Sequence, residues 1–367
     1  MNQTISKPSF QKSETWGRVF LELKQEVHDK VGRLEPGRRQ LITLKAIFFP
    51  LAYFGTYLIA LLYGSSETVL YSCYFLLGIF LVLNFLNLIH EAVHQTLFKR
   101  KWLNNGYVYL LDLMGANSFI WKIRHTRLHH NYPNVMGWDS DFEQSAVARV
   151  FPTGTFSLIH KYQHLYLPVM YPFYLLNWLL VRDFIDFFGN NRLVRKVTSI
   201  DKVEYLKLFV FKGFFIFYTV FMPVLVLDVS MYTAITAFLI LIFTASILSL
   251  LVLLSPHANV FNEFPEAGDD GALPYPWFMH QFVTTNDVKE DNWFTRYFMG
   301  CFNFHIAHHL FPNVNHVYYP EVTDIIKRFA DKHQLPYKQF SLTTSLRNHY
   351  ALLKANASVE NIFEETM

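Results

Sequence analysis

Four long stretches with at most one charged residue constrain the fold of this chain most. Residues 46–66, 68–89 and 229–256 contain no Asp, Glu, Lys or Arg, and residues 208–227 contain only Lys212. A helix needs roughly 20 apolar residues to cross the hydrocarbon core of a bilayer. We therefore predict an all-α integral membrane protein with four transmembrane helices, at about 46–66, 68–89, 208–227 and 231–254.

The connections between these spans predict two helical hairpins. Only Glu67 separates the first two spans, and Asp228 begins an equally short link between the last two. A further apolar stretch, 165–181, contains Pro168 and Pro172 and is too short to cross the bilayer easily. We expect it to form an interfacial or re-entrant helix. A fifth crossing at this point would also place the histidine clusters described below on opposite sides of the membrane.

Basic residues indicate the orientation. The first 45 residues hold nine Lys or Arg, and Lys99, Arg100 and Lys101 follow the first hairpin, whereas the two tight turns hold none. Cytoplasmic flanks of membrane helices are enriched in Lys and Arg. We therefore expect both termini and the histidine clusters to face the cytoplasm. The polar start of the chain predicts no cleavable signal peptide.

The remaining residues predict a cytoplasmic helical cap. Residues 14–34 place apolar side chains at helical spacing, which suits an interfacial helix on the membrane surface or a helix packed on the cap. Residues 258–276 are rich in Gly, Pro and acidic residues and predict a loop, and 320–356 predict two short amphipathic helices. The expected divisions are an N-terminal segment 1–45, a membrane domain 46–350 and a C-terminal tail 351–367.

Composition excludes several other classes of protein. A net charge of +3 supplies no basic field for nucleic acid. Two cysteines, Cys73 and Cys301, cannot form an iron–sulfur site or a Cys-rich zinc site. The distinctive feature that remains is the set of 16 histidines.

Nine of these histidines occur in three clusters and at one isolated position. The sequence HEAVH holds His90 and His94, HTRLHH holds His125, His129 and His130, HIAHH holds His305, His308 and His309, and SPHAN holds His257. Residues three or four apart share one face of a helix, so each cluster can direct imidazoles at one point. So many imidazoles exceed the needs of one tetrahedral zinc but suit two ions such as iron. A carboxylate-bridged di-iron bundle is not expected, because only one Glu-x-x-His motif is present.

The motifs HEAVH, WKIRHTRLHHNYPNV, SPHAN and NFHIAHHLFP, in this order around two hairpins, resemble those of the membrane fatty acid desaturase family over residues 46–350. The resemblance implies a di-iron enzyme that uses O2 and two electrons to introduce a double bond into an acyl chain. It maps the metal ligands onto His90, His94, His125, His129, His130, His257, His308 and His309. The third cluster is most similar to front-end acyl desaturases, which often have Gln at the position of His305, so the ligand role of His305 stays open. No catalytic residue beyond the metal ligands is implied.

The resemblance also implies an external source of electrons. The sequence has neither a dinucleotide fingerprint nor a fused haem domain, so we expect a ferredoxin or cytochrome b5-type donor. Its docking patch is expected at Lys99, Arg100, Lys101, Lys122, Arg124 and Arg127, unless these residues only contact lipid headgroups. The substrate is an acyl-CoA, an acyl-carrier protein or a glycerolipid. The expected location is the bacterial cytoplasmic membrane, with the endoplasmic reticulum as the alternative.

Further residues are expected to support the metal site. Polar side chains near the clusters can orient the imidazoles through their second nitrogen, and the candidates are Glu91, Asp139, Asp141, Glu143, Asn303 and His316. Trp121 and Trp293 are expected to line a substrate tunnel, although simple packing is the alternative for both. The isolated histidines are expected to have no role in the site, and these are His28, His160, His164, His280, His333 and His349.

Three other functions stay open at this level. HEAVH also matches the zinc protease motif H-E-x-x-H, with Glu91 as general base and Asp112 as a third ligand. Hydroxylation, ketolation or epoxidation of a lipid or carotenoid fits the same di-iron scaffold. A membrane metal-binding protein without turnover is the third alternative.

Overall fold

The computed structural model of the chain describes residues 7–358. Its longer helices are α1 (Glu14–Tyr63), α2 (Glu67–Asn84), α11 (Lys202–Ile216), α13 (Met231–His257), α16 (Tyr319–His333) and α17 (Leu342–Ala355). The shorter helices are α3 (His90–Val93), α4 (Lys101–Tyr107), α5 (Tyr109–Leu113), α6 (Ser118–Ile123), α7 (Gln163–Met170), α8 (Tyr174–Asn177), α9 (Asp183–Phe188), α10 (Leu193–Val197), α12 (Met222–Leu227), α14 (Trp277–Thr284) and α15 (His305–Leu310).

Helical turns of other kinds extend several of these helices. Five are π-helical: Phe85–Ile89, Arg124–His129, Trp178–Arg182, Phe217–Phe221 and Phe294–Phe298. Three are 3₁₀ turns: Leu158–Tyr162, Tyr171–Phe173 and His316–Tyr318. Two small parallel strand pairs are exceptions to the all-α prediction, β1 (Ser9–Phe10) with β2 (Ala272–Leu273) and β3 (Asp287–Val288) with β4 (Gln339–Phe340).

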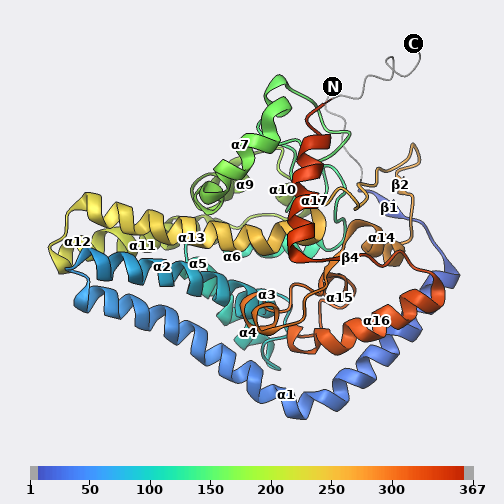
Figure 1. Cartoon of the computed structure of the whole chain (residues 1–367), viewed down its shortest axis with the longest axis horizontal. Helices are drawn as coiled ribbons and strands as arrows, with labels where there is room; N and C mark the ends of the chain where they lie inside the picture. The colour runs from blue at the N-terminus through green and yellow to red at the C-terminus, as the bar shows by residue number, and fades with distance from the viewer. Residues whose placement is uncertain (1–6, 359–367) are drawn as a thin grey trace.

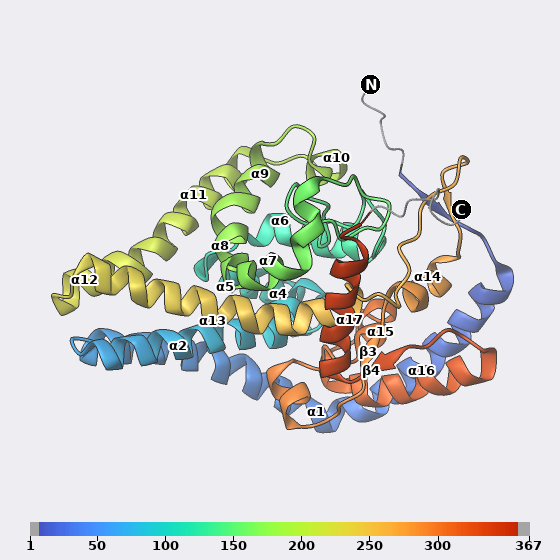
Figure 2. The ribbon, with the colours of Figure 1, turned by 45° about the horizontal axis from the view of Figure 1, so that its top comes forward.

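Four helical segments are long and apolar enough to cross a membrane, which confirms the predicted number of spans. They are Glu14–Tyr63, Glu67–Val93, Lys202–Leu227 and Met231–His257. In Figures 1 and 2 they extend to one end of the molecule, whereas α14–α17 gather at the other end. Helix α2 packs against both α1 and α13. Gly78 permits the second contact, because a Cβ atom there would lie 2.7 Å from the carbonyl oxygen of Leu241.

Helix α1 differs from the prediction, because residues 14–34 and the first span form one continuous helix of 50 residues. Pro36 lies inside it, and the helix bends between its two halves (Figure 1). A proline removes one backbone donor and can kink a helix without ending it. The N-terminal half packs on the cap, with Leu23 and Val27 buried, and Arg38 forms an ion pair with Glu321 on α16. The N-terminal half of α1 therefore packs against α14 and α16.

The apolar stretch 165–181 lies within a helical run, residues 163–188, that comprises α7, α8, α9 and the turns between them. The run is not among the four membrane-length helices. It packs against the middle of α13, where the rings of Phe173 and Phe243 are 4.9 Å apart and the Leu175 amide donates to Ser246 Oγ at 3.0 Å. A buried ion pair, 2.5 Å between Lys212 Nζ and Asp183 Oδ2, joins the run to α11. The single charge in the third span is thus paired inside the protein.

The cap contains the two helices predicted within 320–356. Helix α16 begins with Pro320 in its first turn, and α17 begins after Ser341, whose side chain accepts from the Thr344 amide. Both are amphipathic, with Val322, Ile326 and Leu352 on their buried faces. Helix α15, which carries the third histidine cluster, packs against α14 and α16.

Candidate metal centre

The four histidine-bearing segments approach one another from different elements. His90 begins α3 after a π-helical turn, the second cluster lies on the π-helical turn Arg124–His129, the third lies on α15, and His257 ends α13. In the second cluster, the π geometry brings together residues five apart: the His130 amide bonds to the His125 carbonyl, and their rings are 4.6 Å apart. This π geometry differs from the α-helical spacing expected from the sequence.

All nine clustered histidines, including His305, come together in two groups. The ring nitrogens within each group lie within 4.8 Å of one another, the first group being His90, His94, His125, His130 and His308, and the second being His129, His257, His305 and His309. Eight of the nine residues are buried, and His94 is partly buried. The two groups adjoin, because the rings of His130 and His309 are 4.7 Å apart.

Within the groups, Nε2 atoms converge on one another. Nε2 of His257 lies 2.9 Å from Nε2 of both His305 and His309, and Nε2 of His90 lies 3.0 Å from that of His125. A neutral imidazole that carries its N–H at Nδ1 has its lone pair at Nε2, so Nε2 atoms that face one another present lone pairs with no proton between them. This donor set suits a cation at the centre of each group.

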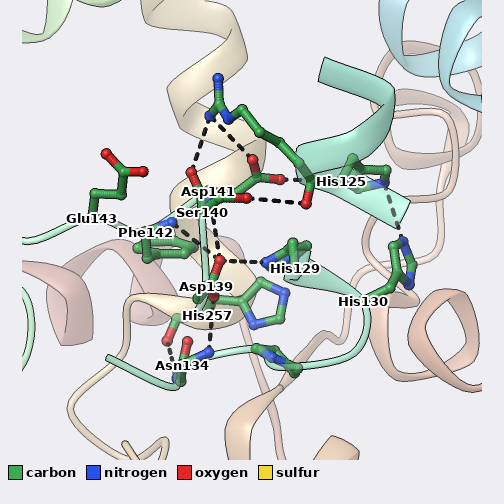
Figure 3. A network of polar contacts seen from close by, with 12 residues as sticks. His125, His129, His130, Asn134, Asp139, Ser140, Asp141, Phe142, Glu143 and His257 are labelled. Carbon is green, nitrogen blue, oxygen red and sulfur yellow. Dashed lines mark hydrogen bonds and ion pairs between the residues drawn. The ribbon is translucent and has the colours of Figure 1, made fainter. Parts of the chain in front are cut away.

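Two aspartates hold the second cluster from outside. Nδ1 of His129 lies 2.9 Å from Asp139 and Nδ1 of His125 lies 3.2 Å from Asp141, as Figure 3 shows. The Asp139 carboxylate also accepts from the amides of Asn134 and Asp141. Both aspartates were predicted for this position. Each one orients an imidazole so that Nε2 faces the other histidines.

Other histidines use partners that the sequence analysis did not identify. Nδ1 of His309 lies 3.0 Å from Gln281 Oε1, Nδ1 of His308 lies 3.3 Å from the Tyr319 hydroxyl, and Nδ1 of His257 lies 3.3 Å from the Thr284 carbonyl. Gln281, Thr284 and Tyr319 lie outside the histidine motifs, so no spacing rule in the sequence marks them.

Burial keeps most of these imidazoles neutral. It lowers the pKa of His125 to about 3, and burial together with neighbouring histidines holds the pKa of His130, His308 and His309 well below the ordinary value. Burial also opposes the charged form of His129, but the Asp139 carboxylate outweighs it and raises the pKa of that residue. Neutral imidazole is the form that binds metal.

Glu91 and His316 form a separate contact behind the first cluster. One Glu91 oxygen lies 3.5 Å from Nδ1 of His90 and 3.4 Å from Nδ1 of His316, and the other accepts from Thr96 Oγ1 at 2.5 Å. Nε2 of His316 lies 2.9 Å from Lys45 Nζ. Both predicted residues therefore lie beside the site, and Lys45 is an additional member that the sequence analysis did not identify.

The structure places four predicted residues elsewhere. Asn303 donates to the Glu290 carbonyl, and Glu143 pairs with Arg192, so neither orients a histidine. Trp293 is 71% exposed at the start of the π-helical turn Phe294–Phe298, and it is not among the residues that line the cavity described below. Arg124 is 3% exposed and pairs with Asp141 within the site, so it cannot belong to an exposed docking patch. The charged side chain of Arg124, within a histidine motif, thus forms an ion pair inside the protein rather than on its surface.

Asp112 also lies away from the histidine groups. It accepts from the Ser118 amide at 3.1 Å and is not among the residues that approach His90 and His94. Those two histidines are instead grouped with three others. The geometry gives the zinc protease interpretation no support.

A cavity of about 590 Å³ adjoins the histidines. Five of them line it: His90, His125, His129, His257 and His305. Trp121 lines it too, stacked on His125 with the ring centres 5.0 Å apart. Apolar side chains of residues 167–185 and of α13 form one part of the remaining wall, and side chains of residues 141–150 form another. A flexible apolar chain can therefore reach the histidines from this side.

Comparison with known proteins places this arrangement among enzymes of lipid metabolism. The family model described as fatty acid desaturase matches residues 65–341. The chain is 31% identical over 350 residues to the acyl-lipid (8-3)-desaturase of Physcomitrium patens, covering 91% of this chain and 71% of that protein. It is 26% identical over 251 residues to the sn-1 linoleoyl-lipid 6-desaturase of Arthrospira platensis, covering 68% of each. It is also 28% identical to the Delta(5) fatty acid desaturase A of Dictyostelium discoideum, covering 87% of this chain and 70% of that protein.

Proposed function

We infer the function of this chain from its family, because it belongs to the fatty acid desaturases. It is an integral membrane oxidoreductase that introduces a double bond into an acyl chain. We propose that the acyl chain is carried by a membrane lipid, because relatives are named for acyl-lipid and linoleoyl-lipid substrates. These names do not favour a hydroxylase or ketolase, and position and chain length are left open.

The two histidine groups support the proposal of two iron ions. His90, His94, His125, His130 and His308 would hold one ion, and His129, His257, His305 and His309 would hold the other. This assignment includes His305 as a ligand, because its Nε2 lies 2.9 Å from that of His257. When bound, a nitrogen-ligated iron pair supplies the O2 activation that removal of hydrogen from an unactivated methylene requires.

The protein's own residues would position the substrate and exclude water. The cavity brings an acyl chain to His90, His129 and His257, and the rings of Trp121 and Phe302 form part of its wall. Asp139 and Asp141 would hold His129 and His125 with Nε2 directed inward. An apolar wall around a nitrogen-rich centre keeps bulk water away from the reacting methylene.

We propose that the four spans form two hairpins, with the termini and a helical cap on the cytoplasmic side. The basic residues of the first 45 positions and the position of the cap at one end of the spans support this orientation. This proposal divides the chain into an N-terminal segment (1–45), a membrane domain (46–350) and a C-terminal tail (351–367). The specific membrane is left open.

We propose that a ferredoxin or cytochrome b5-type protein supplies the electrons. Lys99, Arg100, Lys101 and Arg127 are exposed and can contact an acidic partner, whereas Lys122 is half-buried and Arg124 is buried. Reversing the charges at residues 99–101 should slow turnover with the protein donor more than with a chemical reductant. Equal effects would contradict docking at this patch.

Metal and product analysis tests the proposal as a whole. We expect about two iron ions per chain in protein purified in detergent from iron-supplemented cells, and loss of iron in His129→Ala and His308→Ala variants. Cells that express the active chain should accumulate a new double bond in their lipids in an O2-dependent manner. One zinc ion that survives both substitutions but is lost with His94→Ala would instead indicate a protease.

A further inference from the structure

The cavity beside the histidines has an edge formed by one stripe of the helical run 163–188. Met170, Phe173, Val181 and Ile185 line the cavity and are 45%, 48%, 46% and 46% exposed. They recur at helical spacing, so they form one continuous strip. Side chains that both line a cavity and are half-exposed mark its opening, and here the opening is apolar.

A loop, residues 143–148, forms the other edge. Val147 lines the cavity and is 40% exposed, and its carbonyl accepts from the Tyr166 hydroxyl at 2.6 Å. Because Tyr166 belongs to α7, this hydrogen bond fixes the loop relative to the helical run. The opening is therefore a slot between two tethered edges.

The slot lies beside a membrane-spanning helix. The run contacts α13 at Phe243 and Ser246, and Ser246 precedes the end of α13 at His257 by eleven residues, or about 16 Å of helix. This places Phe173 near the middle of a helix that is long enough to cross the bilayer. The apolar end of the slot therefore lies level with the middle of a membrane-length helix, where a lipid acyl chain rather than water would be its neighbour.

Charged residues follow at the other end of the slot. Arg192 bonds to Glu143 at 2.7 Å and to Asp186 at 2.6 Å, and Arg182 lies 3.6 Å from Glu143. Two guanidinium groups thus meet two carboxylates, and their formal charges cancel. A CoA thioester carries several phosphates that need uncompensated positive charge, whereas a neutral or zwitterionic headgroup does not.

We propose, on the basis of the proposed function, that the acyl chain of an intact neutral or zwitterionic glycerolipid enters the cavity sideways from the cytoplasmic leaflet through this slot. The headgroup and ester remain at the Arg182–Arg192–Glu143 end, and the chain passes Phe173 and Val181 to reach the histidines. The apolar side chains of Phe173 and Val181, followed by the charged groups of Arg182, Arg192 and Glu143, match the order of acyl chain, ester and headgroup in a lipid at the membrane interface.

A matched pair of substitutions in the same helical run tests the route. Val181→Trp fills the slot, whereas Val169→Trp adds the same bulk at a site that is 73% exposed and outside the cavity lining. With vesicles that contain phosphatidylcholine bearing a labelled acyl chain, Val181→Trp should lower kcat/KM by roughly tenfold, because the added ring overpacks the passage. Val169→Trp should behave as wild type, and the iron content and Tm of both variants should be unchanged.

Photochemical labelling gives a readout that does not depend on turnover. Phosphatidylcholine with a diazirine in its acyl chain should label Phe173 and residues of the cavity wall, and Val181→Trp should suppress the labelling inside the cavity. Labelling confined to Val169 and other outward residues would overturn the route. So would equal kcat/KM for the two variants.

The same experiments separate this inference from the proposed function. If wild-type protein with bound iron desaturates no acyl substrate, the proposed function fails. If it desaturates acyl-CoA in solution faster than phosphatidylcholine in vesicles, the function stands, but lateral entry of a glycerolipid is wrong.

Discussion

The carboxylate of Asp139 is completely buried and lies 2.9 Å from Nδ1 of His129. Replacement by Asn removes the negative charge while conserving the size of the side chain. We expect Asp139→Asn to weaken iron binding by roughly 10- to 100-fold, because outer partners of this kind hold a ligand's orientation and basicity. Iron per chain after dialysis against a graded chelator measures this. Asp269→Asn, at an exposed loop position, is the control, and equal retention by both variants would contradict the assignment.

We expect removal of His309 to release metal from the second group of histidines more than from the first. The second group then has three histidines, whereas the first keeps five. We expect His309→Ala to lower the iron content from about two ions to about one per chain, with loss of desaturation. Metal analysis and fatty acid profiles of the same preparation provide the measurement. Two retained ions would show that His309 is not a ligand.

Glu91→Gln should be milder than any substitution in the histidine clusters. Glu91 contacts Thr96 and the His316 amide and lies behind His90, so it supports a ligand without being one. We expect reduced but measurable desaturation in this variant, next to full loss in His90→Ala. Equal loss in the two variants would give Glu91 a larger role, and loss of a proteolytic activity would revive the protease interpretation.

Acid should destabilise the fold partly through His280. Its ring is buried against the Pro133 carbonyl at 3.0 Å, and burial lowers its pKa from 6.5 to about 4. Between these two values the unfolded chain binds the proton and the folded chain does not. The contribution of neutral His280 to the free energy of unfolding is therefore complete above pH 6.5 and is lost as the pH falls to 4. This loss amounts to roughly 3 kcal/mol. In chemical unfolding between pH 7 and 4.5, His280→Gln should show a shallower loss of stability than wild type, whereas exposed His28→Gln should not.

The buried pair of Lys212 and Asp183 should be sensitive to loss of one partner. Asp183 also accepts from the Asn117 amide and the Trp178 indole, so the pair holds the helical run 163–188 and α6 together. Lys212→Met leaves a buried carboxylate without its cation, and we expect a loss of about 3–5 kcal/mol of stability. The double variant Lys212→Met with Asp183→Asn should recover part of it. Equal unfolding free energies for the single and double variants would contradict this explanation.

The membrane spans and the histidine clusters could be predicted from the sequence because both depend on local patterns. A charge-free stretch long enough to cross a bilayer has few alternatives, since every buried backbone group must be bonded within the segment. Histidines at helical spacing, as in HEAVH and HIAHH, predict a shared face for the same local reason. The four membrane-length helices follow these patterns, whereas the structure divides the second and third clusters between the two groups of histidines.

The roles of residues that act through contacts between separate segments could not be predicted in this way. Arg124 looked like a surface cation, yet it pairs in the site with Asp141, 17 residues further along the chain, and Trp293 looked like a tunnel wall but is exposed. Gln281 and Tyr319 reach His309 and His308 from segments without any motif. Spacing along a chain carries no information on such partners.

The sequence by itself determined the membrane-length helices, the histidine clusters and the family, because hydropathy, helical periodicity and motif order are properties of short segments. Only the tertiary structure decided how the histidines divide into two groups, which side chains orient them, and that the run 163–188 borders the cavity beside α13. These features depend on how separate helices pack, and the energy of each contact is shared between residues that are distant in the chain. The π-helical turn under His125 and His130 is an example, because tertiary packing rather than local spacing sets the direction of their rings.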